Sequence, residues 1–158
     1  MRICALDQAS KKTGYAIFED NKLVDYGLIN MGGESDINNR LYKMVDEIHS
    51  IIKQSQANQV VFEDVSQRNN VKTLISLSRL QGMIMEICYQ DNIDFLIYPP
   101  STWRSIIGIT QGASVKRSEL KWQAIEYVNK HYNIKVTDDV AESICIGLAY
   151  IKEHNFKD

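Results

Sequence analysis

The stretch "RICALDQASKKTGYAIFED" (residues 2–20) decides how the fold begins. Residues 2–6 form a short apolar run that ends at Asp7, and residues 14–20 then alternate apolar and polar side chains. Alternation with a period of two is typical of a half-buried strand. The stretch "KLVDYGLIN" (residues 22–30) repeats this alternation after Asp20 and Asn21, a pair that favours a turn. These residues predict three strands joined as a hairpin meander.

Helical and strand-like segments alternate over the rest of the chain. Apolar residues recur at helical spacing in residues 35–54 and 69–90, and each segment is followed by an apolar strand-like run, "QVVFEDV" (residues 59–65) and "IDFLIYPP" (residues 93–100). A strand–helix–strand succession favours parallel pairing with helices packed on the sheet. Three later segments look helical: 101–107, 115–132 and 138–152. The predicted fold class is therefore α/β, with a mixed five-stranded sheet (a three-strand meander plus parallel strands) flanked by helices.

The composition is that of an ordinary globular protein. The chain has 158 residues and a net charge of −2, and 44% of its residues are hydrophobic, so we expect one domain over residues 1–158. The slight acidity argues against a protein that coats DNA, and any nucleic-acid site must be local. No run of about 18 apolar residues is present, and Asp7 comes too early for a secretory signal. We expect a cytoplasmic protein with no membrane partner.

The three cysteines are predicted to be reduced core residues. They are odd in number, they lie in apolar surroundings, and no C-x-x-C pair occurs among Cys4, Cys88 and Cys145. This pattern favours neither a disulfide framework nor a zinc site.

Carboxylates stand where the predicted elements end or begin. Asp7 ends the first strand, and Glu63 and Asp64 interrupt the fourth. The last predicted helix opens with three acids, Asp138, Asp139 and Glu142. The i,i+3 spacing of Asp139 and Glu142 places them on one helix face. The carboxyl ends of neighbouring strands are where open α/β sheets place their sites, so these acids are candidates for one pocket. Spacing alone does not choose between Glu63 and Asp64, which face opposite sides of a strand.

A cluster of carboxylates favours a divalent cation. Like charges in one pocket repel and raise one another's pKa, and a cation relieves this cost. Oxygen ligands suit Mg²⁺ or Mn²⁺ better than zinc, and paired ions about 3.5–4 Å apart promote phosphodiester hydrolysis. A structural explanation stays open for the helix start, because its first turn favours acids. A carboxylate within the apolar strand is harder to explain without a partner.

Four motifs resemble those of RuvC-type Holliday junction resolvases in the RNase H-like superfamily, and the likeness covers nearly the whole chain. "ALDQASKKTGYAIFED" is similar to the first motif of that family, "VVFEDV" to the second and "LSRLQG" to its small-residue helix. The segment from Asp139 to Glu142, followed by "SICIGLA", is similar to the last motif. The resemblance selects Glu63 over Asp64 and Asp139 over Asp138.

The resemblance implies an RNase H-like fold and a set of catalytic metal ligands: Asp7, Glu63, Asp139 and Glu142. Asp7 would bridge both ions of a Mg²⁺ or Mn²⁺ site. The implied activity is that of a divalent-metal-dependent endodeoxyribonuclease. A homodimer would cut four-way DNA junctions by paired nicks that leave 5′-phosphate and 3′-hydroxyl ends.

The resemblance also implies basic residues near the site. They map onto Arg104 in "STWRSIIG" and Lys116 in "GASVKRS". A local cluster of cations is expected to contact phosphates: Lys11, Lys12, Arg104, Lys116, Arg117 and Lys121. Nearby, Trp103 and Trp122 are candidates for base stacking, although a Trp on an amphipathic helix is more often a core residue.

The chain departs from the family pattern at three points. The first motif reads Asp7-Gln8-Ala9-Ser10 where the family usually has Asp-Pro-Gly-Ser, and Glu142 replaces an aspartate, which is expected to favour Mn²⁺. Ser66 stands three residues after Glu63, where members that open the junction centre often carry an aromatic. We therefore expect a broader selectivity for branched DNA, forks included, as in a compact phage-type relative.

Other functions remain open from the sequence. A different RNase H-like or RNA-processing nuclease would need the same acids, and a non-catalytic branched-DNA-binding protein would need only the cations. An actin-like sugar kinase is disfavoured, because 158 residues do not supply two such domains. The helix over residues 69–90 either faces a twin subunit or packs on its own sheet.

Overall fold

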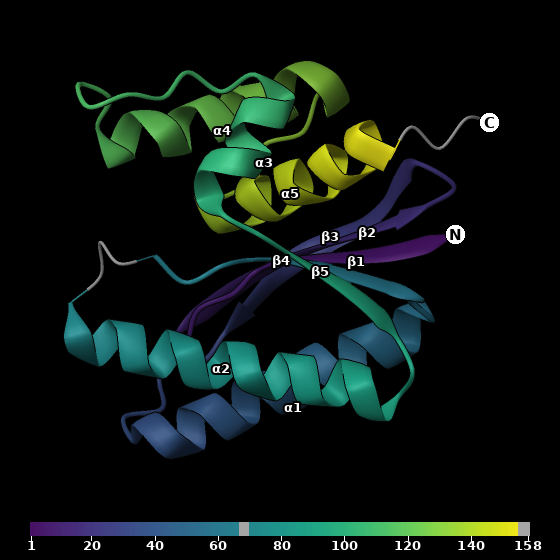
Figure 1. Ribbon diagram of the computed structural model, residues 1–158, viewed down its shortest axis with the longest axis vertical. Coiled ribbons are helices and arrows are strands. Elements are labelled where there is room, and N and C mark those ends of the chain that lie inside the picture. The colour runs from purple at the N-terminus through teal and green to yellow at the C-terminus, as the bar shows by residue number, and fades with distance from the viewer. Residues whose placement is uncertain (67–69, 155–158) are drawn as a thin grey trace.

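The computed structural model describes residues 1–66 and 70–154 (Figure 1). The strands are β1 (Arg2–Asp7), β2 (Lys12–Glu19), β3 (Lys22–Asn30), β4 (Gln59–Glu63) and β5 (Asp94–Tyr98). The helices are α1 (Ile37–Ser55), α2 (Val71–Gln90), α3 (Pro100–Ile107), α4 (Arg117–Tyr132) and α5 (Asp138–His154). These elements follow the predicted order along the chain.

The sheet is mixed, as predicted, with the strand order β3-β2-β1-β4-β5. The first three strands pair antiparallel as a meander. β4 pairs parallel with both β1 and β5, because α1 and α2 carry the chain back across the sheet between successive strands. β1 therefore lies at the centre of the sheet, and its apolar residues 3–6 are fully buried.

Helices cover both faces of the sheet (Figure 1). α1 and α2 pack on one face, where their apolar residues meet Cys4, Leu6 and Phe62. α5 crosses the other face and is itself covered by α3 and α4, and this layer packs on Ile3 and Ala5. Successive residues of a strand point to opposite faces, so the short run of residues 3–6 contributes to both cores. A strand buried on both sides explains why this run is apolar throughout.

The helix boundaries follow from capping residues. Asp36 is the N-cap of α1, and its side chain accepts a hydrogen bond of 2.8 Å from the Asn39 amide. Asn70 does the same for α2 through the Thr73 amide. The predicted start of that helix at residue 69 lies outside the described residues. α4 begins two residues later than predicted, because Lys116 is its N-cap.

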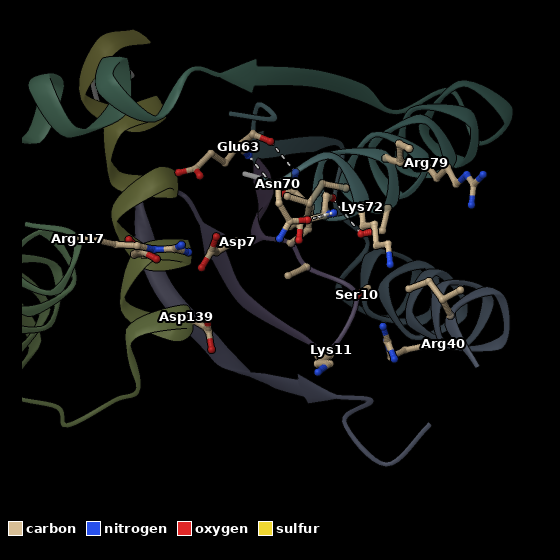
Figure 2. Close-up of a pocket in the computed structure, with 18 of the residues that line it drawn as sticks. Asp7, Ser10, Lys11, Arg40, Glu63, Asn70, Lys72, Arg79, Arg117 and Asp139 are labelled. Atoms are coloured by element: carbon tan, nitrogen blue, oxygen red, sulfur yellow. Dashed lines mark hydrogen bonds between the residues drawn. The ribbon is translucent and has the colours of Figure 1, made fainter. Parts of the chain in front are cut away.

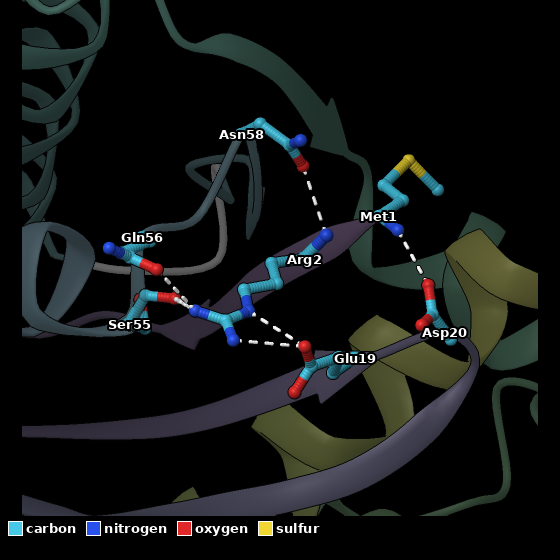
Figure 3. A network of polar contacts seen from close by, with 7 residues as sticks. All are labelled: Met1, Arg2, Glu19, Asp20, Ser55, Gln56 and Asn58. Atoms are coloured by element: carbon cyan, nitrogen blue, oxygen red, sulfur yellow. Dashed lines mark hydrogen bonds and ion pairs between the residues drawn. The ribbon is translucent and has the colours of Figure 1, made fainter.

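The start of β1 is anchored by a polar network (Figure 3). The Arg2 guanidinium donates to Glu19 of β2 at 2.9 Å and to the Gln56 side chain at 2.7 Å. The Arg2 amide also donates to the Asn58 side chain at 3.0 Å. These bonds tie β1 to β2 and to the turn before β4 at the end of the strand opposite Asp7. They add side-chain bonds to the backbone pairing of β1 with β2 and β4.

The cysteines are free and buried, as predicted. Among the described residues, no helix is long and apolar enough to cross a membrane.

Candidate active site

A cavity of about 1040 Å³ opens at the carboxyl edge of the central strands (Figure 2). The four predicted acids line it, and they come from three elements. Asp7 ends β1, Glu63 ends β4, and Asp139 and Glu142 belong to the beginning of α5. The structure therefore brings together all of the acids that the resemblance selects.

Sheet pairing places the first two acids side by side. β1 and β4 run parallel with Leu6 opposite Phe62, so that Asp7 and Glu63 both follow directly at the same end of the sheet. Asp64 does not line the cavity, and its carboxylate accepts a hydrogen bond of 2.8 Å from the amide of Val65. Of the two neighbouring acids in this strand, Glu63 is the one that faces the site.

A close approach of backbones brings the other two acids to the cavity. A Cβ atom added to Gly14 of β2 would lie 2.0 Å from the carbonyl oxygen of Asp139. Only glycine lets the start of α5 come this near to the sheet. Asp138 instead pairs with Lys121 of α4 and does not line the cavity. Adjacent acids at the start of α5 thus have different surroundings.

Glu63 is held at its carboxylate and at its backbone. The buried Trp103 indole of α3 donates to Glu63 Oε2 at 2.7 Å. The Gln8 side chain donates from Nε2 to the carbonyl oxygen of Glu63 at 2.6 Å. Burial raises the pKa of Glu63 to about 7, although the Trp103 hydrogen bond opposes this shift.

Burial and mutual repulsion perturb the remaining acids. Burial raises the pKa of Asp7 well above its usual range, and the neighbouring charges of Glu142, Glu63 and Asp139 add to this rise. A side-chain hydrogen bond also joins Asp7 to Glu142 and favours the protonated form of Asp7. Burial raises the pKa of Glu142 too, and the Arg104 guanidinium, at 3.7 Å from Glu142 Oε1, opposes it. The pKa of Asp139 is raised by burial and by its neighbour Asp138.

The donor set fits a hard divalent cation with an incomplete protein shell. As they stand, no three His, Cys, Asp or Glu side chains of residues 1–66 and 70–154 are grouped closely enough to hold one ion. The acids therefore line a cavity without forming a closed cage. Mg²⁺ commonly binds in this way, through one or two carboxylates with water and substrate phosphate as its other ligands. The charge of such an ion would also remove the repulsion that raises these pKa values.

The predicted cations divide into two groups. Lys11, Arg104, Arg117 and Lys121 line the cavity. Lys12 and Lys116 do not line it: Lys12 begins β2, and Lys116 is the N-cap of α4, where its amide donates to Glu119 at 2.8 Å. The basic residue of "GASVKRS" that reaches the cavity is thus Arg117.

Three cations on the opposite wall were not predicted. Arg40 of α1 and Lys72 and Arg79 of α2 line the cavity across from the acids (Figure 2). The sequence signal was the seven-residue spacing of Lys72 and Arg79, which puts both on one helix face. This spacing is easily missed, because helical periodicity is usually assigned from apolar residues and not from charged ones.

The tryptophans have different surroundings. Trp103 is fully buried in the core, whereas Trp122 of α4 is 61% exposed. For the long helix α2, the sequence left open whether its apolar face packs on its own sheet or faces a twin subunit. Leu80 and Ile84 pack in the core on this chain's own sheet, while Val71 and Tyr89 are exposed.

The chain resembles known proteins over nearly its whole length. Residues 3–149 match the family described as "Crossover junction endodeoxyribonuclease RuvC". A relative of that name from Finegoldia magna is 26% identical over 161 aligned residues, which cover 99% of this chain and 96% of the relative.

Two solved structures show the same fold. The T. thermophilus RuvC in complex with a Holliday junction substrate has a TM-score of 0.77 at 11% identity, with 98% of this chain and 95% of that chain covered. The Fowlpox virus resolvase in complex with Holliday junction DNA has a TM-score of 0.68 at 19% identity, with 99% and 100% covered. The predicted fold class is confirmed as that of the RNase H-like resolvases. With its family match running from the first strand into the last helix, this chain belongs to the RuvC family.

Proposed function

We propose that this chain is a crossover junction endodeoxyribonuclease that resolves Holliday junctions, and that residues 1–158 act as one nuclease domain. The observation that carries the proposal is the convergence of Asp7, Glu63, Asp139 and Glu142 on one cavity in a member of the RuvC family. The relative from Finegoldia magna bears the same enzyme name. A nuclease of this kind acts on DNA in the cytoplasm, where we expect the protein to work.

The four acids are proposed to hold Mg²⁺ or Mn²⁺. Bound divalent ions would activate water for attack on a phosphodiester and stabilise the leaving oxygen. The chain's own part is to place the acids at the ends of two rigid strands and one helix. Arg104, which contacts Glu142 at 3.7 Å, and Arg117 stand where they would also neutralise the charge of the cut phosphate. The longer arm of Glu142 is proposed to suit Mn²⁺ better than Mg²⁺.

The two walls of the cavity are proposed to hold one DNA strand between them. Arg117 and Lys121 lie on the α4 side, and Lys72 and Arg79 lie on the α2 side, with Lys11 between them in the chain's first loop. Cations on both walls provide phosphate contacts that the net charge of −2 does not suggest. Lys12 and Lys116, outside the cavity wall, are proposed to contact the flanking duplex.

A homodimer is proposed because resolution of a junction needs two coordinated nicks. The outer surface of α2 exposes Val71, Met85 and Tyr89. Gly82, on the same helix, has open space where a Cβ would stand, so a second backbone can approach closely. Exposed apolar side chains on one long helix are suited to pairing with the same helix of a second copy.

The selectivity is proposed to extend to other branched DNA, including forks. Ser66 has no ring to stack on a base at the opened junction centre, and such stacking is worth about 1–3 kcal/mol per base. A cleavage panel of intact junction, fork, flap and linear duplex tests this. Activity confined to the intact four-way junction would contradict the broader selectivity but leave the nuclease proposal intact.

The first experiment compares the wild type with Asp7→Asn on a labelled four-way junction. Binding and cleavage are scored separately with Mg²⁺, Mn²⁺ or EDTA. We expect paired nicks by the wild type only with metal, a faster rate with Mn²⁺, and binding without cleavage by Asp7→Asn. Equal binding by both proteins with no cleavage in any metal would make this a junction-binding protein. Preferred cleavage of an RNA–DNA hybrid in the same assay would make it an RNase H-like nuclease.

A further inference from the structure

The side chain of Gln8 continues the sheet beyond its last backbone rung. The parallel ladder of β1 and β4 ends with Leu6 opposite Phe62. Beyond it, Gln8 Nε2 donates to the Glu63 carbonyl oxygen at 2.6 Å, and Gln8 Oε1 accepts from the Glu63 amide at 3.3 Å. A primary amide presents the same donor and acceptor as a peptide group. The Gln8 side chain thus pairs with both backbone groups of Glu63.

The Glu63 carboxylate has its own hydrogen-bond donor. Trp103 Nε1 lies 2.7 Å from Glu63 Oε2, and the Trp103 side chain is 0% exposed. Because the ring is packed in the core, it does not turn with the carboxylate. A glutamate side chain loses rotamer entropy when a metal ion fixes it in one geometry. A rigid hydrogen-bond donor already restricts the carboxylate before the ion binds, so less entropy is lost on binding.

We propose that Gln8 and Trp103 are positioning residues that hold Glu63, Gln8 by its backbone and Trp103 by its carboxylate, ready to bind a divalent cation. Gln8 is a residue at which the first motif departs from Asp-Pro-Gly-Ser, and a proline there would offer neither the donor nor the acceptor. The inference rests on the proposed function, because it assigns to Glu63 the role of a metal ligand. It adds two residues that act through Glu63 and are not themselves metal ligands.

The test uses metal binding rather than cleavage as its main readout. The melting temperature of each protein is followed against Mn²⁺ concentration, since a ligand that binds only the folded state stabilises it. Gln8→Met keeps the length of the side chain and removes the amide, and Trp103→Phe keeps a buried ring and removes the indole N–H. Loss of such a supporting partner typically costs about 10- to 100-fold in metal affinity. We expect each variant to need that much more Mn²⁺ to reach the same thermal shift as the wild type.

A matched control residue lies on β4, the strand that carries Glu63. Gln59 of β4 is 8% exposed, close to the 9% of Gln8, and its Nε2 donates to the Val60 carbonyl oxygen at 3.1 Å, away from the cavity. Gln59→Met should lower the melting temperature without changing the Mn²⁺ dependence. In a Glu63→Gln background, Gln8→Met should no longer change the Mn²⁺ dependence, because the ligand through which it acts is gone.

The outcomes separate the two proposals. If the wild type responds to Mn²⁺ and cuts junctions while Gln8→Met and Trp103→Phe respond to Mn²⁺ as the wild type does, both hydrogen bonds are only structural and the positioning role is overturned. If the wild type itself neither responds to Mn²⁺ nor cuts, the proposed function fails, and the positioning role fails with it. If Gln8→Met does not fold, Trp103→Phe still tests whether the hydrogen bond to the Glu63 carboxylate supports metal binding. Gln8→Glu, which retains an acceptor for the Glu63 amide, then tests the hydrogen bonds to the Glu63 backbone.

Discussion

The four acids that share one cavity should make the metal-free protein less stable as the pH rises. Burial raises the pKa of Glu63 to about 7, and it raises the pKa of Asp7, Asp139 and Glu142 as well. A group whose pKa is higher in the folded state binds protons on folding. Its stabilising effect is complete below the unfolded pKa and is lost as the pH rises through the folded pKa.

The first prediction follows from these raised pKa values. In EDTA, the melting temperature should fall as the pH rises from about 5 to 8, the window set by an unfolded glutamate and the folded Glu63. Mn²⁺ added at the upper end should restore stability, because the cation offsets the ionised carboxylates. Differential scanning calorimetry with and without Mn²⁺ measures both effects. Glu63→Gln, which removes one titrating group, should flatten the slope in EDTA, and an unchanged slope would show that this group does not carry the effect.

The sequence did not predict the hydrogen-bond partners of the acids. The acids were candidates because they end, interrupt or open apolar elements, and the family resemblance then selected Glu63 over Asp64 and Asp139 over Asp138. The bond from Trp103 to Glu63 joins residues 40 positions apart, and the bond from Gln8 to Glu63 joins residues 55 apart. Such pairs depend on how elements pack, and no local pattern of polarity encodes them.

At the scale of elements, the approach of β2 to α5 sets the position of Asp139. The predicted Cβ clash at Gly14 is with backbone atoms, which have no side-chain rotamer by which to move away. The start of the helix must therefore shift if any side chain is added there.

Gly14→Ala is accordingly expected to destabilise the fold by about 1–3 kcal/mol or more, as overpacking typically does. Because Asp139 is displaced with the helix, cleavage should fall further than stability alone explains. Denaturant unfolding and single-turnover cleavage, measured well below the melting temperature, separate the two losses. Gly33→Ala is the control, since nothing lies within 4 Å of its added Cβ. Equal behaviour of the two variants would contradict the close approach.

The polar face of α2 supports a second prediction at this scale. Lys72 and Arg79 line the cavity wall that faces the acids. The double variant Lys72→Ala/Arg79→Ala should weaken junction binding and lower the slope of log affinity against log salt by about 0.9 for each lost phosphate contact. Fluorescence anisotropy across a salt series measures the slope. Lys130→Ala, on the exposed side of α4 and outside the cavity, should leave it unchanged.

Elements were predicted better than surfaces. The meander, the parallel strands and the five helical segments all follow from apolar periodicity, since burial of apolar side chains is what forms these elements. The cations of α2 went unnoticed for the same reason. From sequence alone, the charged face of α2 is interpreted as solvent-exposed surface. Only the fold shows that Lys72 and Arg79 lie across the cavity from the acids.

For the molecule as a whole, the exposed apolar side chains of α2 bear on assembly. Met85→Glu/Tyr89→Glu should convert the proposed dimer to a monomer, because two charges would face two more across a symmetric contact. Sedimentation velocity measures the change. On a cruciform plasmid, the monomer should yield single nicks in place of paired cuts. Tyr42→Glu is the control, because Tyr42 is 62% exposed on α1. A wild type that sediments as a monomer would contradict the proposed assembly.

The order of the acids along the chain has a consequence for biosynthesis. Asp7 closes the first strand, whereas Asp139 and Glu142 belong to the last helix. A ribosome makes all five strands before it makes α5. A polypeptide released by a premature stop codon would contain the strands and lack half of the carboxylates. The proposed set of four metal ligands is therefore complete only when the last helix has been made, and a product that ends before α5 should not cleave DNA.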